Sequence, residues 1–108
     1  MNLNLPAIHP TMLDVSGAIT VENAPAVEAL LTEVIQTLPH DHVVLNMQKV
    51  DFLDSTGLVV LVSAWRLAQD LGKQLSLSAL TPGVRLIFDL TQLDRVFHLI
   101  EESAQFTF

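Results

Sequence analysis

The sequence predicts a single α/β domain, in which a mixed central sheet of four to five strands packs against three to four helices. Short apolar runs alternate along the chain with longer segments of helical periodicity, which is the pattern of strands joined by helical crossovers. The 108 residues suffice for one core and are too few for two domains, and no repeat or linker divides them. We therefore expect one domain over residues 1–108.

Two strands are expected before the first helix. Over residues 13–19 apolar side chains alternate with small or polar ones, as in a half-buried strand, and Gly17 relieves its far end. A shorter strand is expected at Leu3 and Leu5, where Pro6 ends it.

The clearest helix is expected between Asn23 and Pro39. Asn23 is a favourable N-cap, and Pro25 lies in the first turn, where a missing N–H costs little. Pro39 ends the segment. One face of this helix is apolar and is expected to pack on the core: Val27, Leu30, Leu31, Val34, Ile35 and Leu38.

The second half of the chain repeats this alternation. Residues 42–47 predict an inner strand, because their apolar side chains are continuous. Residues 75–79 predict another strand, a short helix begins at Thr81-Pro82, and residues 96–100 predict the last strand. The segment 57–71 is locally ambiguous, because its valines favour a strand. Ser55 and Thr56 are N-cap types and Gly72 is a C-cap type, so we expect a helix there.

The most informative segment is the turn before that helix, Val50-Asp51-Phe52-Leu53-Asp54-Ser55-Thr56-Gly57-Leu58. Ligands and partners of open α/β sheets usually meet the fold where strands give way to helices. Ser55 and Thr56 present hydroxyls there, and Gly57 permits the close approach of another backbone. Asp51 and Asp54 add negative charge.

Local reasoning leaves two interpretations of Ser55 open. Ser55 either caps the helix or lies in a docking surface. A capping box would need Glu or Gln three residues later, where Leu58 stands. The first helical turn is strongly apolar and cannot all face one core, so part of it is expected to form an exposed surface beside the serine.

The run from Val50 to Leu58 resembles the Asp-Ser-(Ser/Thr)-Gly-Leu motif of STAS domains, a family named after sulfate transporters and anti-sigma-factor antagonists. The resemblance extends in order over nearly the whole chain and implies a STAS-like fold. The other matching positions are the strand ending in Gly17, Ala24-Pro25, Val43-Val44-Leu45-Asn46, Thr81-Pro82, Leu86, Phe88, Asp89, Leu90 and Leu93.

Two features depart from the family pattern. Many antagonists carry Gly-Glu-Leu-Asp where this chain has Gly17-Ala18-Ile19-Thr20, so its partner or affinity is expected to differ. The family usually ends in a longer C-terminal helix, whereas the residues after Ile100 here allow a helix of only about two turns. Phe106 and Phe108 there are expected to cover the core or to lie in a dimer contact.

The resemblance implies a regulatory binding protein and not an enzyme: an anti-sigma-factor antagonist in a partner-switching circuit. In the family, a GHKL-type serine kinase that is also the anti-sigma factor phosphorylates the serine after the aspartate. By position this is Ser55, with Thr56 as the alternative. The unphosphorylated antagonist binds the kinase and frees the sigma factor, and a metal-dependent serine phosphatase restores it. The residues expected to bind the partner are Asp54, Ser55, Thr56, Gly57, Leu58 and Val59.

A phosphate on Ser55 would add about −1.5 to −2 charge. The helix N-terminus would favour it by roughly 0.3–1 kcal/mol, whereas Asp51, Asp54 and the net charge of −7 oppose it. We expect little change in the fold. The added charge would weaken a tight interface directly, because desolvating an unpaired dianion costs several kcal/mol and about 1.4 kcal/mol suffices for a tenfold loss of affinity.

The charge balance of the sequence disfavours some classes of binding partner. Five basic residues against twelve acidic ones repel nucleic-acid phosphates and anionic membranes. The sequence has no cysteine, no signal-peptide pattern and no apolar run of about 20 residues. We therefore expect a cytoplasmic protein, a monomer or weak homodimer, that binds no nucleic acid, membrane, cofactor or metal.

Two alternatives stay open. Within the same fold, the chain could be a STAS scaffold or a module that binds lipid or nucleotide, although adjacent Ser55 and Thr56 favour the antagonist. An enzyme is disfavoured, because Asp54-Ser55-Thr56-Gly57 is one residue longer than the Asp-(Ser/Thr)-Gly loop of aspartic proteases and no nucleophile–base–orienter set is visible.

The remaining histidines and aromatic residues are not expected to form a functional site of their own. His40 and His42 flank Asp41 after Pro39 and are expected in a solvated loop, because no third metal ligand follows at a suitable spacing. His9 and His98 are expected to be lone histidines. Trp65 is expected in the core or as a partial anchor of an interface, and Phe88, Leu93 and Phe97 in the core.

Overall fold

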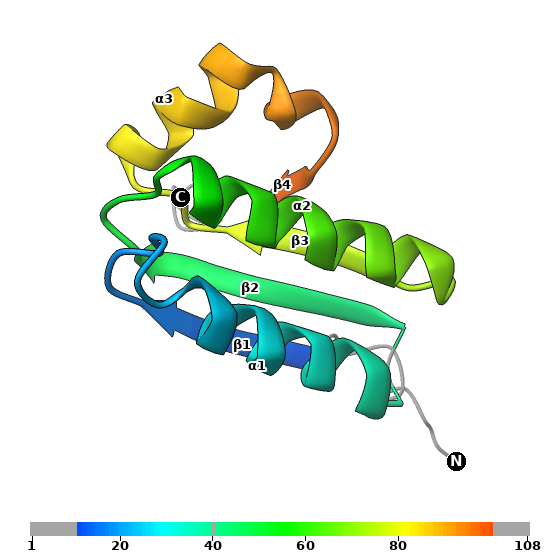
Figure 1. Cartoon of the computed structure of the whole chain (residues 1–108). Helices are drawn as coiled ribbons and strands as arrows, with labels where there is room; N and C mark the ends of the chain where they lie inside the picture. Colours follow the sequence, from blue (N-terminus) through cyan, green and yellow to red (C-terminus); the bar gives the residue numbers. More distant parts are fainter. Residues whose placement is uncertain (1–10, 40, 101–108) are drawn as a thin grey trace.

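The computed structural model describes residues 11–39 and 41–100, and four strands within them form one sheet in the order β1-β2-β3-β4. They are β1 (Thr11–Ser16), β2 (His42–Lys49), β3 (Gln74–Ser78) and β4 (His98–Ile100). Every neighbouring pair is parallel, as Figure 1 shows. The expected α/β fold class is confirmed, but the sheet within the described residues is parallel throughout, whereas a mixed sheet was expected. The strand expected at Leu3 and Leu5 and the helix expected after Ile100 lie outside the described residues, as do His9, His40, Phe106 and Phe108.

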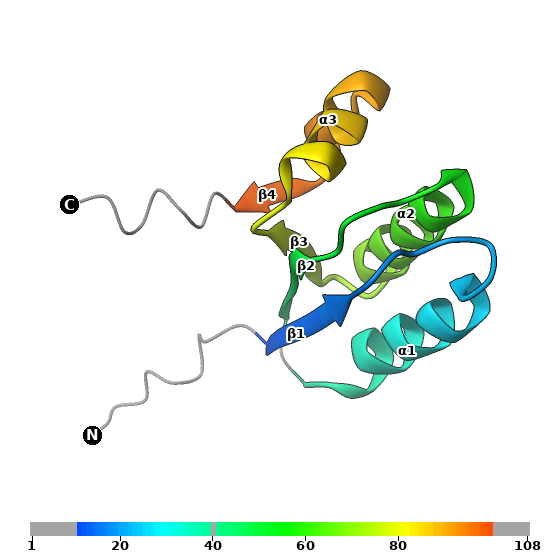
Figure 2. The ribbon, with the colours of Figure 1, turned by 90° about the vertical axis from the view of Figure 1, so that its left-hand side faces the viewer.

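A helix follows each of the first three strands. They are α1 (Ala24–Thr37), α2 (Ser55–Asp70) and α3 (Pro82–Thr91), and a short 3₁₀ turn, η2 (Leu93–Arg95), precedes β4. Figures 1 and 2 show α1 and α2 side by side on one face of the sheet, with α3 beyond α2 at the β4 edge. The helix predicted over residues 57–71 is confirmed and begins two residues earlier. No helix in the described part of the chain is long and apolar enough to cross a membrane.

The core lies between the sheet and the helices. Alternate strand residues point toward α1 and α2, among them Val43, Leu45, Leu75 and Leu77, and all four are almost fully buried. Burial of each aliphatic side chain of this kind stabilises the folded protein by roughly 1.5–3 kcal/mol relative to leaving it exposed to water. At the β4 edge, the Phe97 ring lies 5.6 Å from Phe88 and 6.3 Å from Trp65, measured between ring centroids. The core positions expected for these aromatic residues are confirmed.

The other face of the sheet carries no described helix (Figure 2). The strand residues between the core positions point to it, and they include His42, Ser76 and His98. We call this surface the open face because no described helix covers it, although Val44, Ser76 and Ser78 on it are buried.

The start of α1 differs in one respect from the prediction. Asn23 precedes the helix, but its side chain caps no helical N–H. Its Oδ1 accepts a hydrogen bond from Thr20 N (2.9 Å), and its Nδ2 donates to Ala18 O (2.8 Å). Asn23 therefore braces the loop that leads into α1, and Pro25 occupies the first turn as predicted.

Candidate functional site

The β2–α2 loop is joined to the loop between β1 and α1. Leu53 forms an isolated parallel bridge with Ile19, and Ile19 N donates to Phe52 O at 3.0 Å. Ile19 and Leu53 are buried, whereas Asp51 and Phe52 are exposed. The two loops therefore form one unit at the carboxyl end of the strands, where parallel α/β sheets usually meet their ligands.

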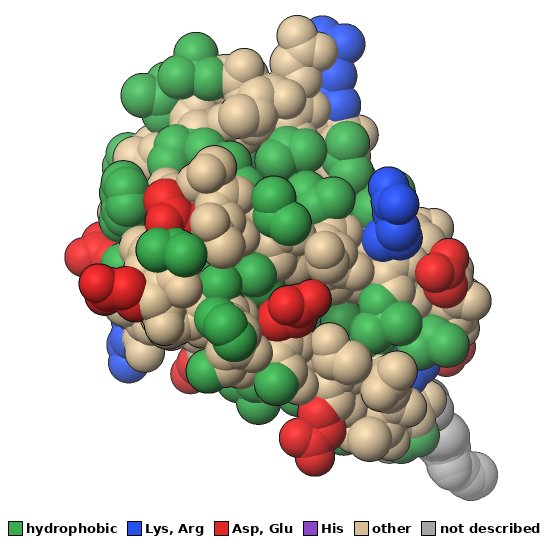
Figure 3. Space-filling model, viewed as in Figure 1, with side chains coloured by type: hydrophobic (Ala, Val, Ile, Leu, Met, Phe, Trp, Pro, Cys, Tyr) green, Lys and Arg blue, Asp and Glu red, His purple; other side chains and the backbone are tan. Residues whose placement is uncertain are grey.

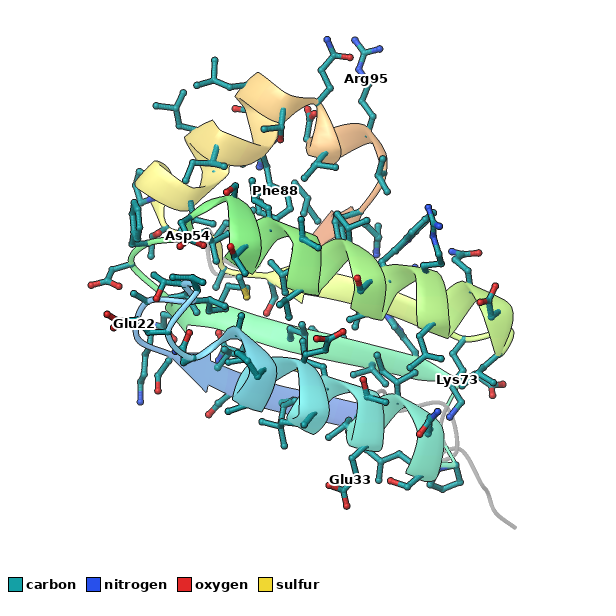
Figure 4. The ribbon with its side chains drawn as sticks, viewed as in Figure 1. Glu22, Glu33, Asp54, Lys73, Phe88 and Arg95 are labelled. Carbon is teal, nitrogen blue, oxygen red and sulfur yellow. The ribbon has the colours of Figure 1, made fainter. Side chains whose placement is uncertain are left out.

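Asp54, and not Ser55 or Thr56, is the N-cap of α2. Its backbone is extended, and its Oδ1 accepts a hydrogen bond from Gly57 N at 2.8 Å. Its Oδ2 accepts a second hydrogen bond from Val21 N at 3.0 Å. Figure 4 shows Asp54 at the start of α2, beside the loop that carries Glu22. Of the two interpretations left open for Ser55, the helix cap is therefore excluded, because the two oxygens of the Asp54 carboxylate accept hydrogen bonds from both the helix start and the neighbouring loop.

Because Asp54 forms the cap, the hydroxyl of Ser55 is not used to begin the helix. Ser55 is the first residue of α2, its side chain is exposed, and no described residue forms a hydrogen bond with its hydroxyl. Thr56 is half-buried. Of the two hydroxyls, that of Ser55 is the more accessible to another protein.

Gly57, in the first turn of α2, lies close to the backbone of the loop between β1 and α1. It is buried, and a Cβ at this position would collide with the carbonyl oxygen of Ile19. The prediction that Gly57 allows a close backbone approach is confirmed, and the approaching backbone belongs to the same chain.

Exposed apolar side chains surround Ser55. Val59, one helical turn later, is 61% exposed, Phe52 is 51% exposed and Val21 is 65% exposed. The expected apolar surface therefore exists, and it includes Val21 and Phe52, which were not among the residues expected to bind the partner. We call Val21, Phe52, Ser55 and Val59 the Ser55 surface.

The same surface continues along α2 and is bordered by acidic residues. An open groove of about 490 Å³ is lined by Leu58, Val59, Val62, Ser63, Arg66, Leu67 and Asp70. Figure 3 shows apolar side chains gathered over α2 and α3, and acidic ones both at the end where the loops lie and elsewhere on this side of the molecule. Glu22 and Asp51 are exposed in these loops. The arrangement suits a protein partner that covers apolar surface, and it opposes added negative charge.

A second cluster of polar residues lies on the open face. His42 is half-buried in β2, and its Nε2 lies 2.8 Å from Ser76 Oγ. The same oxygen lies 2.9 Å from His98 Nδ1 on β4. Burial, together with the nearby His98, lowers the pKa of His42 below its ordinary value of 6.5. The expectations of a solvated His42 and a lone His98 are therefore wrong, because the strand order places both rings over β3.

This second cluster is not a serine–histidine catalytic pair. A nucleophilic serine must reach its substrate, but Ser76 is fully buried. The buried hydroxyl instead joins two imidazoles, so the chemistry open to the cluster is that of the histidine rings.

Comparison with known proteins gives one family. Residues 3–106 match the STAS domain. The anti-sigma-B factor antagonist of Staphylococcus epidermidis is 31% identical over 104 residues, covering 94% of this chain and 95% of that protein. The anti-sigma F factor antagonist of Paenibacillus polymyxa is 24% identical over 107 residues, covering 96% and 92%.

Solved structures share the fold at lower identity. The anti-sigma factor antagonist SpoIIAA in its unphosphorylated form aligns with a TM-score of 0.63 at 14% identity, covering 83% of this chain and 77% of that one. The Bacillus cell fate determinant SpoIIAA in its phosphorylated form aligns with a TM-score of 0.63 at 16% identity, covering 87% and 85%. The four parallel strands and three helices are thus those of the STAS fold.

Proposed function

The chain belongs to the STAS domain family, and from this premise we propose that it is an anti-sigma-factor antagonist switched by phosphorylation of Ser55. In this proposal the unphosphorylated protein binds a serine kinase of the GHKL type, which is also the anti-sigma factor. Phosphorylation releases the protein from the kinase, and a metal-dependent serine phosphatase restores it. The circuit operates in the cytoplasm, and the protein acts by binding rather than by catalysis.

The observation that carries the proposal is the position of Ser55. Asp54 already caps α2, so the Ser55 hydroxyl is exposed and free of hydrogen bonds to described residues. A kinase needs an accessible hydroxyl, and modification of this one leaves the helix cap intact. The names of the two curated relatives and the existence of SpoIIAA in phosphorylated form support the same assignment.

The surroundings of Ser55 supply the physical switch. Before modification, a partner can cover Val21, Phe52 and Val59 and gain roughly 25 cal/mol for each Å² of apolar surface removed from water. After modification, the partner would have to desolvate a dianion beside Asp51 and Glu22. Neither step requires the fold to change.

The first test maps the modified residue. The protein is incubated with ATP and each GHKL-type serine kinase encoded in its own genome, and the product is analysed by mass spectrometry. We expect one phosphate, on Ser55, and none in Ser55→Ala. Thr56→Ala and Ser63→Ala are matched controls, because Ser63 is an exposed hydroxyl on the same helix, and both are expected to be modified at Ser55.

Phosphate on Ser63, or on no residue with any of these kinases, would contradict the proposed switch. In that case the alternative of a STAS scaffold, or of a module that binds lipid or nucleotide, would take its place. Modification of Thr56 alone would move the switch by one residue and overturn the assignment to Ser55.

A further inference from the structure

We propose that two copies of this chain associate through the outer side of α3, with the two helices antiparallel about a two-fold axis. Figures 1 and 2 show α3 at the β4 edge, with no described helix or strand over its outer side. None of the residues of the Ser55 surface takes part, so the proposal does not depend on the function proposed for Ser55. We call the residues involved the α3 surface: Gly83, Arg85, Leu86, Asp89 and Leu90.

The two sides of α3 are both apolar. Val84 and Phe88 are fully buried and hold the helix against the core, and Figure 4 shows Phe88 between α3 and α2. On the outer side, Leu86 is 55% exposed and Leu90, one turn later, is 75% exposed. Leu90 is the most exposed large hydrophobic side chain in the described part of the chain. Two neighbouring leucines left in water on one helix indicate a surface that another molecule covers.

Gly83 provides a space for a side chain of that other molecule. It lies seven residues before Leu90 and therefore on the same side of the helix. A Cβ built on Gly83 would meet no atom within 4 Å. The first turn of α3 thus presents bare backbone, which a leucine of a second copy can approach closely.

The charged residues of α3 favour an antiparallel pair. Arg85 Nε donates to Asp89 Oδ1 at 3.1 Å, and the two side chains are 38% and 48% exposed beside the leucines. In an antiparallel two-fold pair these flanks lie on the same side, so Arg85 of one copy lies opposite Asp89 of the other. In a parallel pair the flanks lie on opposite sides. Exposed ion pairs of this kind add little affinity, but they determine direction and register.

One register satisfies all of these contacts. When Arg85 lies opposite Asp89 of the second copy, a rise of about 1.5 Å per residue offsets the two Leu86 side chains by only about 3 Å along the helix axis. In the same register each Leu90 lies within about 1.5 Å, along the axis, of Gly83 of the second copy. The leucine that projects farthest therefore meets the position that has no side chain.

The charge of this region also permits a second copy to approach. Residues 82–95 contain two basic and two acidic residues, so their net charge is zero in a chain whose net charge is −7. A helix of ten residues is only about 15 Å long. Because such a helix covers less than the roughly 1,200 Å² of a stable interface, we expect a weak dimer, with a dissociation constant of roughly 0.1–1 mM.

Sedimentation equilibrium of the full chain, from about 10 µM to about 2 mM, tests the proposal. The mass is expected to rise from the 11.9 kDa of one chain toward twice that value. Leu86→Gln and Leu90→Gln are each expected to weaken association at least about tenfold. Leu30→Gln is the matched control, because Leu30 is 46% exposed on α1, and it is expected to associate as the wild type does.

Disulfide cross-linking tests the register, since the chain has no cysteine of its own. Leu86→Cys is expected to form a linked dimer under mild oxidation. Leu90→Cys is expected to link much more slowly, because its two copies lie about 9 Å apart along the axis and a disulfide joins Cα atoms about 4.4–6.8 Å apart. Leu30→Cys is expected to link as slowly as Leu90→Cys.

Three results would overturn the proposal: the mass of one chain at every concentration, undiminished association in both leucine variants, or faster linking of Leu90→Cys than of Leu86→Cys. Both leucines are exposed, so their variants are expected to keep the circular dichroism spectrum of the wild type. Ser55→Ala is expected to associate as the wild type does, so failure of the Ser55 switch would leave these results unchanged.

Discussion

The carboxylate of Asp54 holds the backbone of Val21, 33 residues earlier in the chain, through a hydrogen bond of 3.0 Å from Val21 N to Oδ2. The other oxygen, Oδ1, accepts from Gly57 N at 2.8 Å and so caps α2. One side chain thereby fixes the start of the helix and the loop beside it. Because Asp54 does both, the cap does not depend on the Ser55 hydroxyl, which forms no hydrogen bond with a described residue.

Replacement of Asp54 by alanine is expected to lower the free energy of unfolding by about 2 kcal/mol, because it removes a helix cap and leaves Val21 N–H without its acceptor. Asp54→Asn keeps one acceptor oxygen, so a loss of about 1 kcal/mol is expected. Urea unfolding measures both. Asp51→Ala is the control, because Asp51 is exposed in the same loop, and it is expected to stay within about 0.5 kcal/mol of the wild type. Equal stabilities of Asp54→Ala and Asp51→Ala would show that the cap contributes nothing.

Alanine at position 57 is expected to destabilise the protein although it favours helices. Its Cβ would collide with the Ile19 carbonyl, and such overpacking costs about 1–3 kcal/mol. Gly83→Ala in α3 is the matched control, since no atom lies within 4 Å of its added Cβ. It is expected to raise stability by about 0.5–1 kcal/mol. Thermal melts that shift in the same direction for both variants would contradict the close approach at Gly57.

Lys73 closes the opposite end of the helix layer. Figure 4 places it at the ends of α1 and α2 away from Asp54. Its Nζ donates to the carbonyl oxygens of Ile35 and, at 2.7 Å, Leu38, where α1 ends. Lys73→Met keeps the aliphatic stem and is expected to lower the free energy of unfolding by about 1.5–3 kcal/mol. Lys49→Met is the control, because Lys49 is exposed, and urea unfolding is expected to show little change in its free energy of unfolding. A similar loss of unfolding free energy in both variants would argue against the contacts of Lys73 with the two carbonyl oxygens.

His42 is expected to make stability depend on pH. Its pKa in the folded protein is lowered by burial and then by His98, so the unfolded chain, with a pKa near 6.5, binds the proton more readily. The contribution is fully present above pH 6.5 and is lost as the pH falls through the lowered pKa. Among the described residues, Ser76 forms a hydrogen bond with His42 and His98 acts on its charge. Urea midpoints at pH 7.5 and 5.5 should therefore differ more in the wild type than in His42→Gln, and an equal difference would exclude His42 as the cause.

The order of the helices and strands could be predicted because local sequence patterns determine each of them. Proline in the first turn of α1, the continuous apolar run of β2 and the Thr81-Pro82 start of α3 each determine one element without long-range contacts. The helix after Ser55 was also predictable, because its cap residues and later helix formers outweigh its valines.

The details of the candidate site could not be predicted in the same way. Asp54, Ser55 and Thr56 are all good N-cap types, and local sequence cannot choose among them. The choice follows from the Val21 N–H, which the fold brings alongside. His42 and His98 were likewise dismissed separately, because only the order of β2, β3 and β4 places them over Ser76.

The most direct test of the central claim compares the affinity of one cognate kinase for two forms of this protein, unmodified and phosphorylated on Ser55. Calorimetry at physiological salt measures both. The account predicts that the phosphorylated form binds at least about tenfold more weakly, which corresponds to about 1.4 kcal/mol, while circular dichroism shows the same fold. Equal affinities for the two forms would contradict the proposed switch.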